Sequence, residues 1–357
     1  MKKISLKDIA AAVGVAPSTV SFVLNGKGKQ MRISDSLAEK IRETADKAGY
    51  HPNKIAVSLR TGTSKILGLI VEDISNNFFA SLAKIIEVEA EKFGYNVVFC
   101  STENDTRKGK QLLRILSQQQ VDGFLVTPTI GMRSDLEILL QQHQPIILMD
   151  RYYPELKVSS VLANNIDGVT RAMEHLINQG YSNIGFVTVD LDLVQMQERE
   201  QAFVDCLKAN NIEQTGGSVF KLPINTPQEE AVQMIQEYIS RHGHLDALFF
   251  ATNYLGIAGL ESLRNLGLKV PKDKAVICFD DHDIFRLYSP GITTICQPIE
   301  EIGSTAVKLL ISKISQSPKL DDSHVVSLGT RLVIRGSTAL KTEDKVESLR
   351  SLHNRLF

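Results

Sequence analysis

Residues 8–25 read DIAAAVGVAPSTVSFVLN, and their pattern predicts how the N-terminal end of the chain folds. Its first half has the apolar spacing of a short helix that ends at Gly14, the residue type best able to take the positive φ of a tight turn. Pro17 fits the first turn of a second helix, where its missing N–H is not needed. Two short helices around a glycine turn are typical of a helix-turn-helix, and we predict one here.

The residues around that stretch support the same interpretation. Ser5 is placed to cap the first helix, and Asp8 follows three residues later, where a carboxylate can return the bond. A third helix is predicted over 35–48, ended by Gly49. The second helix, 17–24, turns its apolar side chains inwards. We expect its outer face to be formed by Ser18, Thr19, Ser21 and Phe22.

The N-terminal end of the chain is basic, whereas the rest is acidic. Residues 1–65 contain 12 Lys and Arg against 5 Asp and Glu, which leaves 28 basic and 36 acidic residues elsewhere. A basic end favours binding to a polyanion, and the second helix of a helix-turn-helix enters the major groove of DNA. A three-helix domain without a ligand is the alternative. We predict a DNA-binding headpiece over residues 1–50.

The quoted stretch resembles the headpiece signature of the LacI/GalR family of transcriptional regulators, which is roughly D-[IV]-A-x-x-[AV]-G-V-S-x-x-T-V-S-R-[VI]-L-N. Phe22 stands where that family usually has arginine, so the usual contact to guanine is replaced by a side chain suited to a thymine methyl. Ala16 replaces the usual serine. The resemblance implies base contacts from Pro17, Ser18 and Phe22 and backbone contacts from Thr19, Ser21 and Asn25, and we add Ser5 to the expected DNA contacts.

Residues 51–64, HPNKIAVSLRTGTS, predict a short helix and linker, begun by Asn53 and broken at Gly62. Such a short helix is marginal in water without a partner, and an ordinary interdomain linker is the alternative. The segment resembles the hinge helix of the same family. That resemblance implies that two subunits pair their hinge helices in the minor groove, where Leu59 wedges into a base step beside Ala56. Asn53, Ala56 and Leu59 are therefore further expected DNA contacts.

From residue 65 onward, apolar runs of strand length alternate with helical stretches. Runs that are apolar on both faces and separated by helices are typical of parallel sheets covered on both sides. The rhythm occurs in both halves, so the predicted fold class is an all-α helix-turn-helix headpiece followed by α/β, with two doubly wound parallel-sheet lobes. The clearest runs are ILGLIV (66–71), NVVF (96–99), GFLV (123–126), IILM (146–149), NIGFVTV (183–189) and ALFFA (247–251).

This second part resembles the type I periplasmic-binding-protein-like body of the LacI/GalR family, in segments such as GYNVVFCSTEND, VDGFLVTP and SPGITTICQP. The resemblance implies one effector-binding and dimerisation domain over residues 65–340. It also implies that the chain crosses between lobes near Asn164, Thr293 and Gly329. Lobe one is then 65–163 with 294–328, and lobe two is 164–293 with 329–340. Residues 341–357 form a charged tail; some family members tetramerise through such a tail, and a frayed helix is the alternative.

Ligands of such sheets bind beyond the carboxyl ends of the strands, where aromatic and polar side chains occur in this sequence. Phe78 and Phe79 are candidates for stacking on an apolar sugar face, with core packing as the alternative. Asp150 and Arg151 end one strand and either reach the ligand or pair with each other. Thr127 is a further candidate. The resemblance adds Arg199 in EREQAF, Asn253 in ATNY, Asp280 in FDD and Gln297 in TTICQP.

The residue types in this set suit a carbohydrate or a similar polyol, because amides, carboxylates and guanidinium groups bind hydroxyls beside aromatic faces. Tyr254 stands where the family has aspartate after Asn253, which alters the capping of the helix that follows. The expected function is a homodimeric, sequence-specific repressor on a pseudo-palindromic operator, controlled by a small effector between the lobes.

Other function classes are disfavoured. The four cysteines, Cys100, Cys206, Cys278 and Cys296, are too scattered for a disulfide or zinc framework. The loop DDHD (280–283) resembles a metal cluster, but neighbours on one loop rarely converge on one ion. We expect no metal, no cofactor and no enzymatic activity. A sugar-modifying enzyme is a rival that turnover of a sugar would support.

A sugar-binding transport receptor would share the body of this protein but would have a signal peptide and no headpiece. The start MKKISLKDIAAAVGV has no long apolar stretch, and the sequence has no run of eighteen apolar residues. We therefore expect a cytoplasmic protein that does not bind a membrane.

Overall fold

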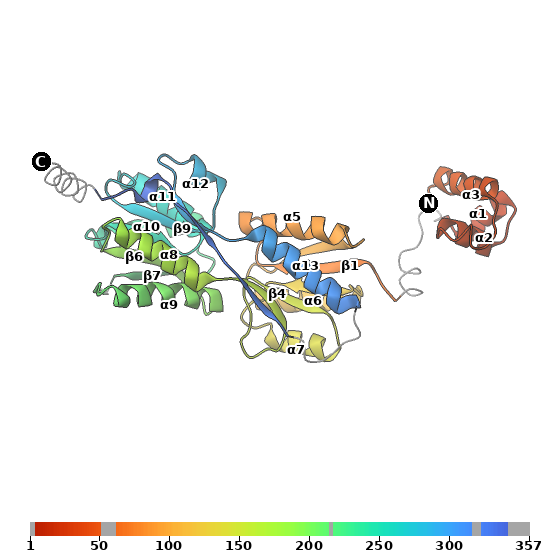
Figure 1. Cartoon of the computed structure of the whole chain (residues 1–357), viewed down its shortest axis with the longest axis horizontal. Helices are drawn as coiled ribbons and strands as arrows, with labels where there is room; N and C mark the ends of the chain where they lie inside the picture. The colour runs from red at the N-terminus through yellow and green to blue at the C-terminus, as the bar shows by residue number, and fades with distance from the viewer. Residues whose placement is uncertain (1–3, 51–61, 214–216, 316–322, 342–357) are drawn as a thin grey trace, which may run out of the picture. The chain divides into compact units, whose positions relative to one another are not determined.

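The computed structural model describes residues 4–50, 62–213, 217–315 and 323–341, which form two units, Met1–Ser64 and Lys65–Phe357 (Figure 1). The expected hinge contacts Asn53, Ala56 and Leu59 lie outside the described residues, as does all but the first residue of the charged tail. Within the described part, no single helix is long and apolar enough to cross a membrane.

The N-terminal unit has three helices, α1 (Leu6–Val13), α2 (Pro17–Leu24) and α3 (Asp35–Lys47). The Ser5 side chain caps α1 and the Asp8 carboxylate returns the bond to the Ser5 backbone N–H at 2.8 Å. Gly14 adopts a φ of +81°, and the axes of α1 and α2 differ by 106°. This is the predicted helix-turn-helix geometry. Its buried core consists of Ile9, Ala10, Val20, Val23, Ala38, Ile41 and Ala45.

The C-terminal unit contains two six-stranded sheets, one in each lobe. Sheet one is parallel throughout, and sheet two is parallel except for its edge strand β12. The order in sheet one is β11 (Val325–Leu328), β5 (Ser159–Ala163), β4 (Ile146–Met149), β3 (Gly123–Val126), β1 (Ile66–Val71) and β2 (Asn96–Ser101). The order in sheet two is β12 (Arg331–Val333), β10 (Thr293–Cys296), β9 (Ala275–Phe279), β8 (Ala247–Phe250), β6 (Ile184–Asp190) and β7 (Val219–Pro223).

Helices cover both faces of each sheet, as the apolar strands require. In lobe one, α5 (Asn77–Glu91) and α13 (Ile299–Ser315) bury one face, while α6 (Thr106–Gln118) and α7 (Arg133–Gln141) bury the other (Figure 1). In lobe two, α8 (Asn165–Asn178) and α9 (Val194–Ala209) lie against one face. The other face packs against α10 (Gln228–Arg241), α11 (Asn253–Asn265) and the short α12 (Asp283–Leu287); the 3-10 helix η1 (Gly336–Thr338) lies near the end of the described chain. The predicted fold class is confirmed.

The chain crosses between the lobes three times, and one crossing differs from the prediction. The crossings after β5 at Asn164 and between β11 and β12 at Gly329 are where we expected them. The crossing predicted near Thr293 is wrong by about four residues, because β10 pairs in parallel with β9 in sheet two. Ile295 of β10 packs in the core of lobe two, so that lobe extends to Cys296 and the chain returns at Gln297.

Candidate DNA-binding surface and effector cleft

The start of α2 presents exposed side chains. Pro17 and Ser18 are exposed, and the N-cap residue Ala16 makes no side-chain bond to the helix end. Phe22 is half-buried and lies outside the headpiece core. Free side chains and backbone N–H groups at a helix start suit contact with base edges and phosphates.

The other expected DNA contacts of the headpiece are partly engaged within it. Asn25 donates to the Ser21 carbonyl at 2.6 Å and lies 3.3 Å from the Ser21 hydroxyl, and both Ser21 and Thr19 are half-buried. The Ser5 hydroxyl donates to Asp8 at 2.6 Å as part of the cap. The loop between α2 and α3 adds the exposed cations Lys27, Lys29 and Arg32, which are suited to phosphates.

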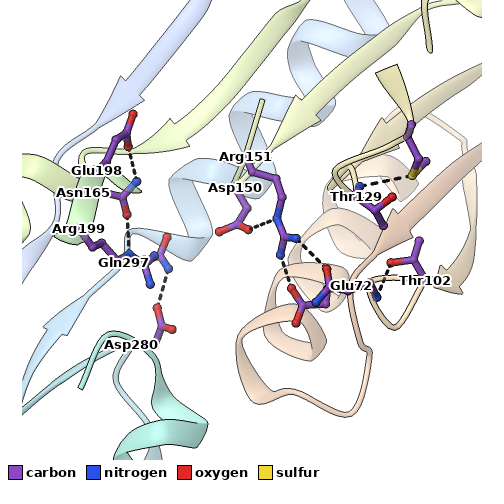
Figure 2. A network of polar contacts seen from close by, with 12 residues as sticks. Glu72, Thr102, Thr129, Asp150, Arg151, Asn165, Glu198, Arg199, Asp280 and Gln297 are labelled. Atoms are coloured by element: carbon purple, nitrogen blue, oxygen red, sulfur yellow. Dashed lines mark hydrogen bonds and ion pairs between the residues drawn. The ribbon is translucent and has the colours of Figure 1, made fainter. Parts of the chain in front are cut away.

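Arg199 of α9 is the centre of a buried network in lobe two (Figure 2). Its Nε donates to Asn165 at 2.9 Å and its Nη1 to the Ala251 carbonyl at 2.7 Å, while the guanidinium lies 3.5 Å from the centre of the Phe279 ring. Asn165 in turn donates to Glu198 at 2.8 Å. Burial lowers the pKa of Arg199, and the nearby Asp280 and Asp150 carboxylates oppose that shift.

Asp280 and Gln297, two of the residues that the family resemblance added, meet beside that network. Asp280 follows β9 with a φ of +67°, and Gln297 donates to its carboxylate at 2.6 Å (Figure 2). Burial raises the pKa of Asp280, although Arg199 and the Gln297 hydrogen bond act in the other direction. The buried Oε1 atom of Gln297 has no hydrogen-bond partner among the described residues. Asp280, Gln297 and Arg199 therefore form one polar cluster in lobe two.

Asp150 and Arg151 pair with each other in lobe one, and Arg151 has two further partners. Its Nε donates to Asp150 at 3.2 Å, its Nη1 donates to Asn104 at 2.9 Å, and its Nη2 forms an ion pair with Glu72 (Figure 2). Burial by itself would lower the pKa of Arg151, but the carboxylates of Glu72 and Asp150 outweigh it and raise that pKa. Every nitrogen of this guanidinium thus has an acceptor.

Phe78 and Phe79 pack in the core, which the sequence analysis gave as the alternative to stacking on a ligand. Both are buried in the core of lobe one, with ring centroids 5.0 Å apart in an edge-to-face arrangement. Thr127 is also buried, and its hydroxyl has no hydrogen-bond partner among the described residues. Asn253 is buried at the start of α11 and bonds to Asn76 of lobe one.

A cavity of about 210 Å³ opens at the carboxyl ends of β6 and β7, beside the starts of α9, α10 and α11. Lobe one contributes Glu72, Asn104 and Arg151 to its wall, so the cavity spans both lobes. Of the predicted effector contacts, Arg151 alone lines it. The other walls are Val189, Leu191, Leu193, Gln195, Met196, Leu222, Pro223, Ile224, Asn225, Thr226, Gln228, Ala231, Tyr254, Leu255 and Ala258.

Sequence reasoning missed most of these wall residues, although a signal for them exists. Gln195 and Thr226 follow the ends of β6 and β7, which is the rule that selected the other candidates. Tyr254 was noted only as a departure from the family pattern. It lies at the cavity with 38% of its surface exposed, and desolvation raises the pKa of its hydroxyl to about 12.

The acidic loop after β9 has separate structural contacts. Arg335 holds Asp281 through two hydrogen bonds of 2.9 and 2.8 Å. His282 caps α12 by accepting from the Ile284 backbone N–H at 3.1 Å. Among the described residues, no three His, Cys, Asp or Glu side chains are grouped to hold a metal ion.

Known proteins resemble both units of the chain. Residues 5–53 match bacterial regulatory proteins of the lacI family, and residues 173–338 match a periplasmic binding protein-like domain. The transcriptional regulator PtxS of Pseudomonas plecoglossicida is 30% identical over 95% of this chain and 97% of its own length. The chain belongs to the lacI family. This lacI-family chain is also 28% identical to the ribose operon repressor of Halalkalibacterium halodurans, over 94% of its length and 97% of that protein.

Two solved structures of transcriptional regulators share the fold. The complex of the regulator CelR with cellobiose matches with a TM-score of 0.69 at 26% identity, over 94% of this chain and all of that one. The lac repressor dimer bound to operator and the anti-inducer ONPF matches with a TM-score of 0.82 at 22% identity, over 95% of this chain, and shows the fold alone. The family match and the curated relatives confirm the predicted family and DNA-binding regulatory function. The ribose operon repressor and the repressor PurR of Aliivibrio salmonicida, which is 30% identical over 93% of this chain and 98% of its own length, are transcriptional repressors, a class of proteins that are not enzymes.

Proposed function

We propose that this lacI-family protein is a homodimeric repressor whose affinity for a pseudo-palindromic operator is set by a small carbohydrate effector bound between its lobes. In this proposal each predicted domain has one task. The headpiece binds DNA, residues 51–64 act as the hinge, and the two lobes bind the effector and form the dimer. Because it works on DNA, its place is the cytoplasm. It has no catalytic step in this scheme.

The DNA half of the proposal rests on the start of α2. Pro17 and Ser18 are exposed there, next to a helix end with no side-chain cap, and Phe22 lies one turn further along the helix. Such a helix start can approach base edges without the loss of any internal contact. Thr19, Ser21 and Asn25 are proposed to fix the helix against the sugar–phosphate backbone, which positions it without reading sequence.

The effector half rests on the polar cluster of Arg199, Asp280 and Gln297 and on a cavity that includes residues of both lobes. Among the described residues, the Gln297 Oε1 atom and the Thr127 hydroxyl have no hydrogen-bond partner, and both can bind the hydroxyls of a ligand. An effector can shift the lobes only by binding one arrangement more tightly than the other. We propose that this shift decides whether two hinge helices pair on DNA.

The DNA half is tested with Ser18→Ala. Operator duplexes are first selected from a random pool with the full-length protein, and binding is then measured by fluorescence anisotropy at fixed salt, because salt alone changes affinity strongly. We expect Ser18→Ala to weaken specific binding while the affinity for random duplex stays the same. The matched control is Ser36→Ala on the exposed start of α3, which should change neither. Equal specific affinity of the Ser18 variant and the parent contradicts the assignment.

The effector half is tested by a thermal-shift screen of sugars and sugar derivatives. A ligand that binds only the folded protein raises the melting temperature by an amount set by its concentration over its Kd. Arg199→Ala and Asp280→Ala should abolish that rise, and the same ligand should change operator affinity in the parent protein. A retained shift removes these residues from the site. A shift without any change in operator affinity contradicts the regulatory role.

A further inference from the structure

On the side of lobe two, the cavity between the lobes has a large apolar area beside the polar side chains of Gln195, Asn225, Thr226, Gln228 and Tyr254. Its walls there are formed by side chains of β6, β7 and the helices that follow them, chiefly Val189, Leu191, Leu193, Met196, Leu222 and Ile224. A bare sugar has hydroxyls around its ring, and any hydroxyl that lies against the apolar area without a partner costs free energy. A wall of this kind instead favours a ligand group of alkyl or aryl character.

The charges at the cavity are already neutralised by contacts within the protein. Of its wall residues only Glu72 and Arg151 are charged, and they form an ion pair with each other. Arg151 also donates to Asp150 and Asn104, so each nitrogen of its guanidinium already has an acceptor. Arg199 nearby is engaged by Asn165, the Ala251 carbonyl and the Phe279 ring. A phosphate or carboxylate ligand would therefore have to break a buried ion pair to find a cation.

One polar atom on the cavity wall needs a partner. Gln195 is 1% exposed and lines the cavity, and its Oε1 has no hydrogen-bond partner among the described residues. A buried carbonyl oxygen of this kind is costly unless a donor reaches it, and a ligand hydroxyl is such a donor. Tyr254 stands at the same cavity with an uncharged hydroxyl that can donate and accept. The wall thus combines an apolar surface with polar groups that bind hydroxyls and carry no net charge.

We infer that the ligand of this cavity is an uncharged glycoside whose apolar aglycone contacts the hydrophobic wall of lobe two while a sugar hydroxyl donates to Gln195. This inference rests on the proposed carbohydrate effector and narrows its class. Free monosaccharides lack the apolar group, and sugar phosphates and sugar acids carry a charge for which the described wall residues offer no unpaired cation.

The experiment compares matched probes on the full-length protein by isothermal titration. For glucose, galactose, mannose, xylose and ribose, each set contains the free sugar, the methyl glycoside, the phenyl glycoside and the sugar phosphate. We expect at least one phenyl glycoside to bind about tenfold or more tightly than its free sugar, with the methyl glycoside between them and the phosphate weakest. The inference is overturned if no phenyl glycoside binds, if a free sugar binds as tightly as its phenyl glycoside, or if a phosphate binds best.

Two variants separate the wall from the rest of the site. Ile224→Asp places a charge on the half-exposed part of the wall and should weaken the phenyl glycoside about tenfold while the free sugar changes little. The control Ile138→Asp changes a more exposed isoleucine on α7 that does not line the cavity, and should change neither. Gln195→Met removes the acceptor at similar volume and should weaken every glycoside alike.

The same titrations distinguish failure of this inference from failure of the proposed function. Operator affinity is measured separately with and without each probe. If a free sugar alters operator affinity as strongly as any glycoside, and Ile224→Asp leaves all probes unchanged, the inference fails and the carbohydrate-controlled repressor stands. If glycosides bind as described but operator affinity never changes, the cavity is assigned correctly and the regulatory proposal fails.

Discussion

Asn76 of lobe one and Asn253 of lobe two exchange hydrogen bonds across the cleft. The Asn253 amide donates to Asn76 at 3.0 Å, and the Asn76 amide donates to Asn253 at 3.4 Å. Asn76 also caps α5 by accepting from the Phe78 backbone N–H at 3.0 Å, and Asn253 begins α11. This reciprocal pair therefore links the first turns of two helices in different lobes.

Breaking this pair should loosen the lobes by a measurable amount. We expect the two side chains to be coupled by about 1 kcal/mol in a double-mutant cycle of Asn76→Ala and Asn253→Ala, since a hydrogen bond contributes about that much to stability. The cap of α5 is lost in the Asn76→Ala variant and in the double variant, so the free energy of that loss cancels in the cycle. Urea unfolding of the four proteins gives the coupling. Additive effects of the two substitutions would show that the bonds do not hold the lobes together.

The ion pair between Asp281 and Arg335 predicts a pH-dependent contribution to stability. Burial alone would raise the pKa of Asp281, but the hydrogen bonds and charge of Arg335 outweigh it and lower that pKa below 3.8. The folded protein therefore binds this proton less readily than the unfolded chain does. The contribution is complete well above pH 3.8 and is lost as the pH falls from there through the lower folded-state pKa.

Asp281→Asn should accordingly lower the free energy of unfolding by about 1–2 kcal/mol at pH 7, and the difference from the parent should shrink towards pH 3. The measurement is the urea midpoint at a series of pH values. Asp283→Asn is the matched control, because its pair with Arg286 is largely exposed and should contribute little at any pH. A difference that is constant across the pH range would argue against the pair as its source.

Phe22 predicts an operator that differs from that of a protein with arginine at this place. Phe22→Arg restores a side chain that can bind guanine through two hydrogen bonds, so preference at one base pair should move towards G·C by about 1–3 kcal/mol. Sequencing of duplexes selected from a random pool by the parent and by the variant measures this shift. Identical preferences at every position would mean that residue 22 does not read a base. Lys29→Ala, in the adjoining loop, is expected to weaken all duplexes alike.

The cap of α1 is expected to control the local stability of the headpiece. Ser5→Ala removes the acceptor for the Asp8 backbone N–H, which should cost about 1 kcal/mol. Hydrogen exchange of the Ile9 and Ala10 amides should then accelerate about fivefold in the full-length protein. Ser36→Ala, on the first turn of α3 but not its cap, is the comparison and should leave these amides unchanged. Equal exchange in both variants would mean that the cap does not hold α1.

The headpiece could be predicted from its sequence because its structure depends on local chemistry. A capping serine, a glycine at positive φ and a proline at a helix start each act within a few residues. The buried strands of the body can be predicted for the same reason, because each is a local run of apolar residues. The strands β5 and β11 and the helices α12 and α13 were not singled out, since α12 has only five residues and Val325 in β11 is 60% exposed.

The site was less predictable, because its contacts join distant parts of the chain. Arg151 was recognised as a candidate, but its partners Asn104 and Glu72 lie 47 and 79 residues away, and nothing in the sequence pairs them. Phe78 and Phe79 follow a strand like other cleft residues, yet the packing of α5 and α13 buries them. Residue type and strand order thus locate the edge of the sheet, while side-chain packing decides which residues line the cavity.

The three chain crossings at Asn164, Gln297 and Gly329 constrain how the lobes can move. A single connection would let the two lobes translate and rotate freely. Three short connections restrict sliding and separation of the lobes, so bending is the motion that costs least. A ligand that binds between the lobes can therefore change mainly the angle at which they bend towards each other. An insertion of one residue in any one crossing would change the direction of this bending. The crossings should therefore tolerate insertions far less readily than the surface loops of either lobe.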